Sequence, residues 1–182
     1  MLLDLFPFNT VVFPHQKLSL RIFEPRYLNL IETCHREERS FGVSLIREGK
    51  EVGAPAISFE IGTSVVIREF VKVSDSLFNI IVQGERRFRT KHIMHEQPHI
   101  LLEIEWLDSK IPNYSGDYSL LRNIISGFVE DKSGIPKDNN ELFGLLGELI
   151  ASFPGEKQRI LELSDEKVIP ALTRFLESIW LQ

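Results

Sequence analysis

The chain has 182 residues, of which 43% are hydrophobic and 26% charged, and its formal net charge is −5 at pH 7. These values are ordinary for a soluble globular protein of one domain or two small ones. They argue against a surface dominated by phosphate contacts, which needs clustered Lys and Arg. Cys34 is the only cysteine, so no intramolecular disulfide forms and a reducing cytoplasm is the expected location.

The N-terminus lacks a basic segment followed by a long apolar run, so no signal peptide is predicted. No window approaches the ~18 uninterrupted apolar residues of a membrane-spanning helix. We therefore expect no membrane contact.

The opening of the chain predicts a strand that leads directly into a helix. Leu18, Leu20 and Ile22 alternate with polar residues, which is typical of a half-buried strand. Pro25 then suits the first position of a helix. That helix is predicted to extend to Arg36.

More strands are expected up to about Trp106. Apolar residues alternate through residues 61–73 and 78–82, and Asp75-Ser76 between these segments predicts a hairpin turn. Residues 100–106 alternate in the same way. Several strands joined by short turns favour a small barrel or sandwich.

The period becomes helical after the turn-rich segment 108–117. Apolar stripes predict helices over residues 118–128 and 142–153, a short helix over 156–163 and a last helix over 168–180. Pro170 is expected in the first turn of the last helix, because further inside it would cost a hydrogen bond. We therefore expect a β-rich part over residues 1–110 and a helical part over 111–182.

Ordered motifs in the first half of the chain resemble one family. Leu5-Phe6-Pro7-Phe8, Phe13-Pro14 and Arg21-Ile22-Phe23-Glu24-Pro25-Arg26-Tyr27 look like the opening of the Lon N-terminal domain, the substrate-recognition part of the ATP-dependent protease Lon. Phe41-Gly42-Val43, residues 48–53, Ile61-Gly62-Thr63 and residues 84–89 follow in the same order. The motifs cover roughly residues 2–90, and residues 142–176 more weakly resemble the helical tail of free-standing members.

The resemblance implies an α+β fold, in which a PUA-like small β-barrel with one inserted helix precedes a helical bundle of three to four helices. It also implies a non-catalytic binding module that recognises exposed hydrophobic polypeptide in protein quality control. A protease or chaperone is the possible partner. The ATPase and Ser-Lys protease modules of full-length Lon have no counterpart in this sequence.

Searching the residues for catalytic motifs gives the same expectation of no enzyme and no cofactor. The sequence has neither a P-loop nor a Gly-x-Ser-x-Gly nucleophile motif. Cys34 and His35 would point about 100° apart on a helix, which separates a nucleophile from its base. His92, His95 and His99 do not converge at the spacing that zinc requires, so no metal site is predicted.

Two roles are open for the strand–helix corner. Glu24, Pro25 and Arg26 are candidates for an architectural corner, in which Glu24 or Arg26 forms an ion pair. The functional alternative is an apolar groove that binds polypeptide, because an exposed apolar surface surrounded by charged residues suits a binder of unfolded segments. Its candidate residues are Val11, Phe13, Pro14, Phe23 and Tyr27.

The only basic cluster is a predicted strand that contains Arg86, Arg87, Arg89 and Lys91. A solvated face is the simpler interpretation, and contact with an anionic partner is the alternative. Nucleic acid is an unlikely partner, given the net charge and the lack of exposed aromatic residues among the arginines. RNA binding through this strand, and small-ligand binding by the barrel or in a cleft between the two halves, remain alternative functions.

Overall fold

The computed structural model describes residues 1–50, 56–129 and 132–180, and within them the chain has a mixed α+β fold. The strands in these ranges are β1 (Leu2–Phe8), β2 (Lys17–Ile22), β3 (Phe41–Glu48), β4 (Ile57–Ser58), β5 (Ile61–Ser74), β6 (Leu77–His95) and β7 (Ile100–Trp106). The helices are α1 (Pro25–Arg36), α2 (Tyr118–Phe128), the 3-10 turn η1 (Lys132–Gly134), α3 (Asn139–Leu149), α4 (Pro154–Leu161) and α5 (Asp165–Trp180).

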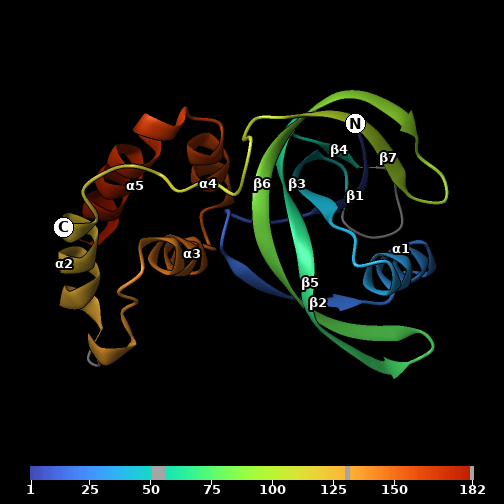
Figure 1. Ribbon diagram of the computed structural model, residues 1–182, viewed down its shortest axis with the longest axis horizontal. Coiled ribbons are helices and arrows are strands. Elements are labelled where there is room, and N and C mark those ends of the chain that lie inside the picture. Colours follow the sequence, from blue (N-terminus) through green and yellow to red (C-terminus); the bar gives the residue numbers. More distant parts are fainter. Residues whose placement is uncertain (51–55, 130–131, 181–182) are drawn as a thin grey trace.

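The strands form a small closed barrel. Neighbouring strands follow the order β1-β7-β6-β5-β3, and parallel pairing of Leu5–Phe8 with Gly42–Leu45 joins β3 back to β1. The other ladders are antiparallel. β2 pairs with β6 outside this path, and the two residues of β4 pair with the end of β3 (Figure 1). The predicted barrel with one inserted helix is confirmed.

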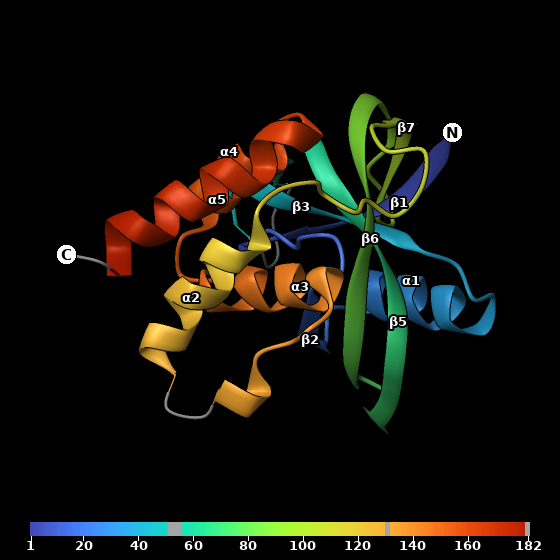
Figure 2. The same ribbon diagram turned by 60° about the vertical axis from the view of Figure 1, so that its left-hand side comes forward.

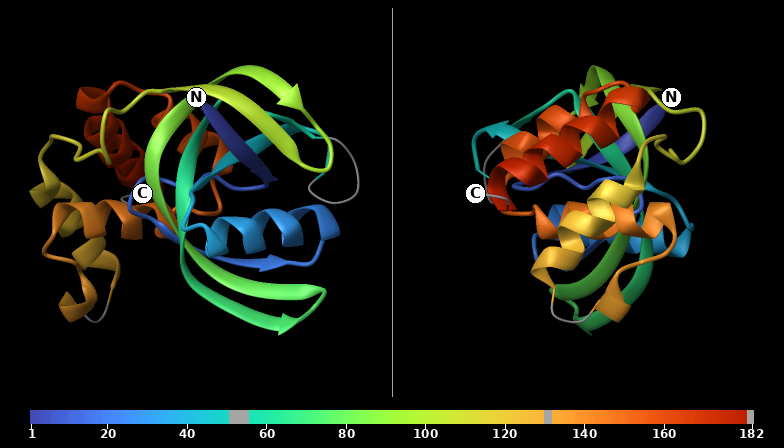
Figure 3. Two further views of the ribbon diagram at one scale, coloured as in Figure 1. Left: turned by 45° about the vertical axis from the view of Figure 1, so that its right-hand side comes forward. Right: turned by 90° about the vertical axis from the view of Figure 1, so that its left-hand side faces the viewer.

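The long β5–β6 hairpin extends beyond the rest of the barrel (Figure 3). Its turn lies at Asp75 and Ser76, as the sequence predicts, since Ser74 pairs with Leu77. Beyond the point where β5 leaves β3, this arm carries two exposed apolar side chains. Val71 is 55% exposed and Val73 is 53% exposed.

Four α-helices cover one side of the barrel, and α1 lies on the other (Figure 2). The expectation of three or four helices after the barrel is therefore confirmed. The expected place of Pro170 in the first turn of the last helix is wrong. α5 begins at Asp165, so Pro170 lies in the second turn and leaves one helical position without an N–H donor.

The largest apolar core joins the two halves. It consists mostly of residues from the helices, but Val11, Phe13, Leu45 and Ile61 contribute to it from the β-rich half. A second core lies between α1 and the barrel, and a smaller third one surrounds Phe88. The two halves thus differ in secondary structure but share a core, and the boundary near residue 110 stays a prediction.

Close backbone contact holds α3 against the loop after β1. A Cβ atom at Gly144 would lie 2.7 Å from the carbonyl oxygen of His15, and one at Gly147 would lie 2.6 Å from Oε1 of Gln16. The contact at Gly144 is with backbone, which cannot shift as a side chain can, so this position requires glycine. The loop that contains Phe13 and Pro14 is consequently enclosed between the barrel and α3.

Candidate functional site

The strand–helix corner is held by backbone and side-chain contacts of Glu24. Its carbonyl oxygen accepts hydrogen bonds from the N–H groups of Tyr27 and Leu28, both at 2.9 Å, and its carboxylate pairs with Arg26 at 2.9 Å. The Arg26 guanidinium lies 4.6 Å from the centre of the Tyr27 ring. Pro25 takes the first helical position, where its missing N–H costs nothing.

The structure does not bring the five predicted groove residues together on one surface. Val11 and Phe13 lie in the shared core, where the Phe13 ring stacks on Phe143 at a centroid distance of 5.1 Å. Pro14 is buried beside them. These three residues are therefore corrected from a surface groove to the interior, because α3 covers their loop.

The remaining two predicted groove residues lie apart from that loop. Phe23 is 51% exposed at the corner itself. Tyr27 is only 3% exposed, and its ring centroid lies 4.5 Å from that of Phe6. Tyr27 also lines a cavity whose lining does not include Phe23. Tyr27 is thus the one predicted groove residue that borders a pocket.

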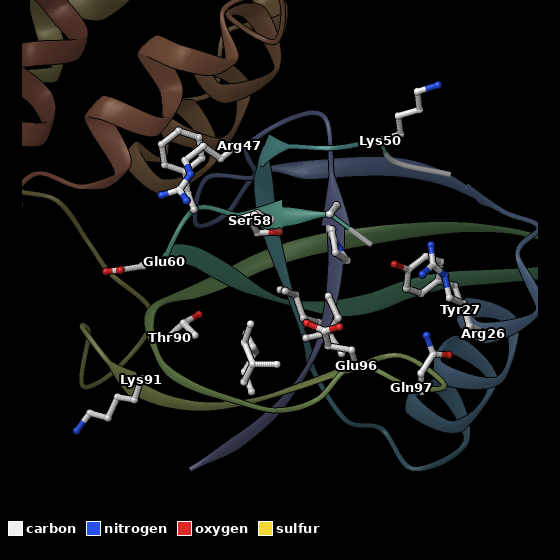
Figure 4. A pocket seen from close by; sticks show the side chains of 18 residues that line it. Arg26, Tyr27, Arg47, Lys50, Ser58, Glu60, Thr90, Lys91, Glu96 and Gln97 are labelled. Carbon is white, nitrogen blue, oxygen red and sulfur yellow. The ribbon is translucent and has the colours of Figure 1, made fainter. Parts of the chain in front are cut away.

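That pocket is a cavity of about 320 Å³, here named the β4–β6 groove (Figure 4). Ser58 of β4 lies along one side, whereas Thr90, Lys91, Glu96 and Gln97 lie along the other (Figure 4). Apolar residues of β1, α1, β7 and the β4–β5 connection line it: Leu5, Pro7, Tyr27, Phe59, Ile100 and Leu102.

Two isoleucines from different strands line the groove and are about half exposed. Ile57 of β4 is 52% exposed, and Ile93 of β6 is 57% exposed. Sequence reasoning missed both residues. Ile57 belongs to a strand too short to show a period, and Ile93 lies in the histidine-rich end of β6, where no alternation marks a buried face.

The groove lies where β4 and the end of β6 are each paired with only one described strand. β5 begins at Ile61, which pairs with Arg89, and the N–H of Thr90 donates to the Glu60 carbonyl at 2.8 Å. Beyond Thr90, residues 91–95 of β6 pair only with β7. Likewise, β4 pairs only with β3. Each of these short segments therefore has one edge without a strand partner among the described residues.

The predicted basic strand is solvent-exposed at Arg89 and Lys91, but Arg87, which was expected on the same solvated face, is buried. Arg87 is buried, and its guanidinium pairs with Asp108 at 2.7 Å and also with Asp165. It further donates to the carbonyl oxygens of Leu161 and Leu163. Burial lowers the pKa of Arg87, but the hydrogen bonds and charge of Asp108 outweigh this effect and leave the pKa raised.

The other members of this strand also have partners. Arg86 lies over the Trp106 ring at 4.2 Å and donates to the carbonyl oxygen of Asp108. Arg89 and Lys91 both pair with Glu105, each at 3.2 Å. The strand therefore links the barrel to the helical half and does not present a row of unpaired cations.

Lys157 is a second buried cation at the junction of the two halves, and sequence reasoning did not single it out. Its ammonium donates to Oε1 of Gln16 at 2.9 Å and to the carbonyl oxygen of Gly147 at 2.8 Å, and it lies 5.1 Å from the Phe13 ring. Burial lowers the pKa of Lys157 to about 7. No carboxylate within ion-pair distance compensates this burial in the described part of the chain.

The candidate histidines remain separate. Nε2 of His99 lies 2.9 Å from the Asp4 carboxylate, and the His95 and His99 rings are 6.3 Å apart. Across the three described ranges, no group of three or more His, Cys, Asp or Glu side chains could hold a metal ion. The same ranges contain no helix that is long and apolar enough to cross a membrane.

Comparison with known proteins assigns this arrangement to a family. A family model described as the ATP-dependent protease La (LON) substrate-binding domain matches residues 3–172. The chain belongs to the Lon substrate-binding domain family. The family that the motifs indicated is thereby confirmed, and the match extends through most of the helical half.

Curated relatives of this Lon domain are much longer proteins. The Lon protease of Dictyoglomus thermophilum is 26% identical over 187 residues, which cover 93% of this chain and 24% of that protein. The Lon protease of Syntrophomonas wolfei is 28% identical over 173 residues, which cover 86% of this chain and 21% of that protein. The chain thus spans about a quarter or less of the length of these relatives.

Solved Lon domains share the fold. The crystal structure of a Lon N-terminal domain protein from Xanthomonas campestris superposes with a TM-score of 0.72 at 25% identity, covering 97% of both chains. The N-terminal domain of the Lon protease from the Mycobacterium avium complex gives a TM-score of 0.67 at 14% identity, covering 98% of this chain and 97% of that one. The second similarity shows the fold alone.

Proposed function

We propose that this Lon substrate-binding domain is a non-catalytic module that binds exposed apolar segments of unfolded polypeptides through the β4–β6 groove. The observation that carries the proposal is the apolar lining of that groove, with the half-exposed side chains of Ile57 and Ile93 at its border. Apolar contacts are non-directional, so they tolerate many sequences, as a binder of unfolded chains requires.

The expected affinity per contact is modest. Full burial of an isoleucine stabilises a complex by about 1.5–3 kcal/mol, so covering the exposed half of Ile57 or Ile93 contributes roughly 1 kcal/mol each. A few such contacts minus the cost of ordering a flexible chain give weak, reversible binding. Weak binding suits a module that samples polypeptides in protein quality control, where a protease or chaperone would act on the captured chain.

The proposal places this activity in the reducing cytoplasm. Cys34 is buried in α1, and burial raises the pKa of its thiol to about 11. The group is therefore a neutral, enclosed thiol at physiological pH. A chain with this single cysteine has no need of an oxidising compartment.

Small-ligand binding is the second candidate, because the groove volume of about 320 Å³ lies at the lower end of ligand pockets. RNA binding has less support, since Arg87 is buried and Arg89 and Lys91 share one carboxylate. A thermal-shift screen of metabolites distinguishes the small-ligand alternative, since a ligand at a hundred times its Kd adds about 2.7 kcal/mol of stability.

Fluorescence polarisation of a labelled, unfolded apolar peptide tests the proposal. The double variant Ile57→Glu, Ile93→Glu is expected to weaken binding at least tenfold. The matched control is Val71→Glu, Val73→Glu, which alters two valines of similar exposure on the β5–β6 arm and should bind as the unaltered protein does. Equal affinity of all three proteins for the peptide would refute the groove.

Hydrolysis assays test the non-catalytic part of the proposal. The purified protein should hydrolyse neither ATP nor casein. Peptidase activity without ATP that survives repurification would contradict this part of the proposal.

A further inference from the structure

The β4–β6 groove is bounded by two strand edges that have no strand partner in the described part of the chain. Within residues 1–50, 56–129 and 132–180, residues 91–95 of β6 pair with β7 on one side only, and β4 pairs with β3 on one side only. Both segments line the same cavity, with β4 and the end of β6 on opposite sides (Figure 4). An unpaired strand edge presents backbone N–H and C=O groups to any extended chain that approaches it.

We infer that the groove binds its polypeptide as an added β-strand, which pairs with the free edge of β6 at residues 91–95. This inference rests on the proposed function. Strand addition joins sequence-independent backbone hydrogen bonds to apolar pockets for alternate side chains. Ile57 and Ile93 provide exposed apolar surface in the lining, and Leu5, Leu102 and Tyr27 also line the groove but are each at most 3% exposed.

The added strand is expected to be short. Two register shifts interrupt the β6–β7 ladder, one between Thr90 and His92 and the other between Ile93 and His95. Such irregularities bend a strand and break the alternation of its outward groups. The ladder with the peptide should therefore span only about three to five residues, which is consistent with weak binding.

The charges around the groove favour a basic residue in or beside the apolar segment. Three of its four cations have carboxylate partners outside the lining: Arg26 pairs with Glu24, Arg47 with Glu48 and Lys91 with Glu105. Lys50 and the two lining carboxylates, Glu60 and Glu96, form no ion pair with any described residue, so the unpaired charges of the lining are one positive and two negative. The occupant that matches these charges is an extended apolar segment flanked by Lys or Arg.

Backbone N-methylation of the peptide tests strand addition without altering the protein. The probe is a labelled peptide with five apolar residues flanked by lysines, methylated at one backbone nitrogen at a time. Polarisation should show about tenfold weaker binding at one or two positions, with the position between them tolerant, because alternate N–H groups of a strand point to the same edge. A glutamate-flanked peptide with the same apolar core should bind several-fold more weakly at low salt.

The outcomes separate the two proposals. If the unmethylated peptide binds and every methylated peptide binds equally well, strand addition is wrong, but polypeptide binding stands. A uniform loss at all positions, or tighter binding of the glutamate-flanked peptide, also contradicts this occupant. If neither unmethylated peptide binds, the proposed function and the strand-addition inference are both overturned.

Discussion

Replacing Lys157 by methionine should change how the stability of this protein depends on pH. The pKa of Lys157 is lowered from 10.5 to about 7 by burial where α4 contacts α3 and the loop after β1. A lysine whose pKa is lower in the folded state destabilises the fold when it is protonated. This penalty is small above pH 10.5, grows as the pH falls toward 7, and is constant below the folded pKa.

The size of the effect follows from the difference between the two pKa values. Each pKa unit corresponds to 1.36 kcal/mol, so the full penalty at acidic pH is roughly 5 kcal/mol as an upper bound. Between pH 7 and pH 9 it should shrink by about 2 kcal/mol, because the unfolded chain binds the proton and the folded chain does not. Lys157→Met lacks this penalty but removes a hydrogen-bond donor from the Gly147 carbonyl oxygen and from Oε1 of Gln16, of which the latter keeps the N–H of Phe13; this loss is a cost of its own at every pH.

Urea unfolding of both proteins at pH 7, 8 and 9, followed by the fluorescence of Trp106 and Trp180, measures this effect. The unfolding free energy of the unaltered protein, minus that of Lys157→Met, should rise by about 2 kcal/mol from pH 7 to pH 9. Taking the difference cancels the titration of groups common to both proteins. A difference that is constant with pH would refute the reasoning, since it would mean that the folded protein keeps Lys157 charged throughout.

Two other perturbations of the junction between the halves have matched controls. Gly144→Ala should destabilise the protein by about 1–3 kcal/mol in urea unfolding, because its Cβ would press on the His15 backbone. Gly127→Ala in α2, where a Cβ meets nothing within 4 Å, should instead be neutral or stabilise by up to about 1 kcal/mol. Equal effects of the two substitutions would contradict the packing argument. Arg87→Met should lower stability by about 3–5 kcal/mol by leaving Asp108 buried without its cation, whereas Asp165→Asn, at a carboxylate that is 60% exposed, should cost less than about 1 kcal/mol. Thermal unfolding checks both, and a larger loss in Asp165→Asn than in Arg87→Met would contradict the importance assigned to the buried Arg87–Asp108 pair.

Local sequence patterns predicted much of the fold. The strand that ends at Ile22, the helix from Pro25 to Arg36 and the turn at Asp75-Ser76 all follow from alternation, proline placement and turn chemistry, which act over a few residues. Pro170 was misplaced because packing of α5 outweighs the loss of one hydrogen bond. The balance between helix packing and the lost hydrogen bond depends on tertiary contacts, which a short sequence segment does not reveal.

The candidate site was harder to predict because burial depends on which element covers a segment. Phe13 and Pro14 have the composition of an apolar surface loop, but α3 encloses them through the close approach at Gly144. Arg87 and Phe88 are adjacent in β6 and so lie on opposite faces of the strand, which predicts that one of them is exposed to solvent. Both are buried, because the helical half covers the face that carries Arg87. Ile57 and Ile93 line the same groove because β5 begins only at Ile61, so that β4 and residues 91–95 of β6 are not joined by a strand between them.

Hydrogen exchange of the backbone amides, with and without a saturating apolar peptide, tests most directly whether the β4–β6 groove binds polypeptide. Peptide binding should slow exchange in residues 57–58 and 91–95, with little change in the β5–β6 arm or in α2. Protection confined to another surface, or no protection while the peptide is bound, would contradict the assignment of the groove.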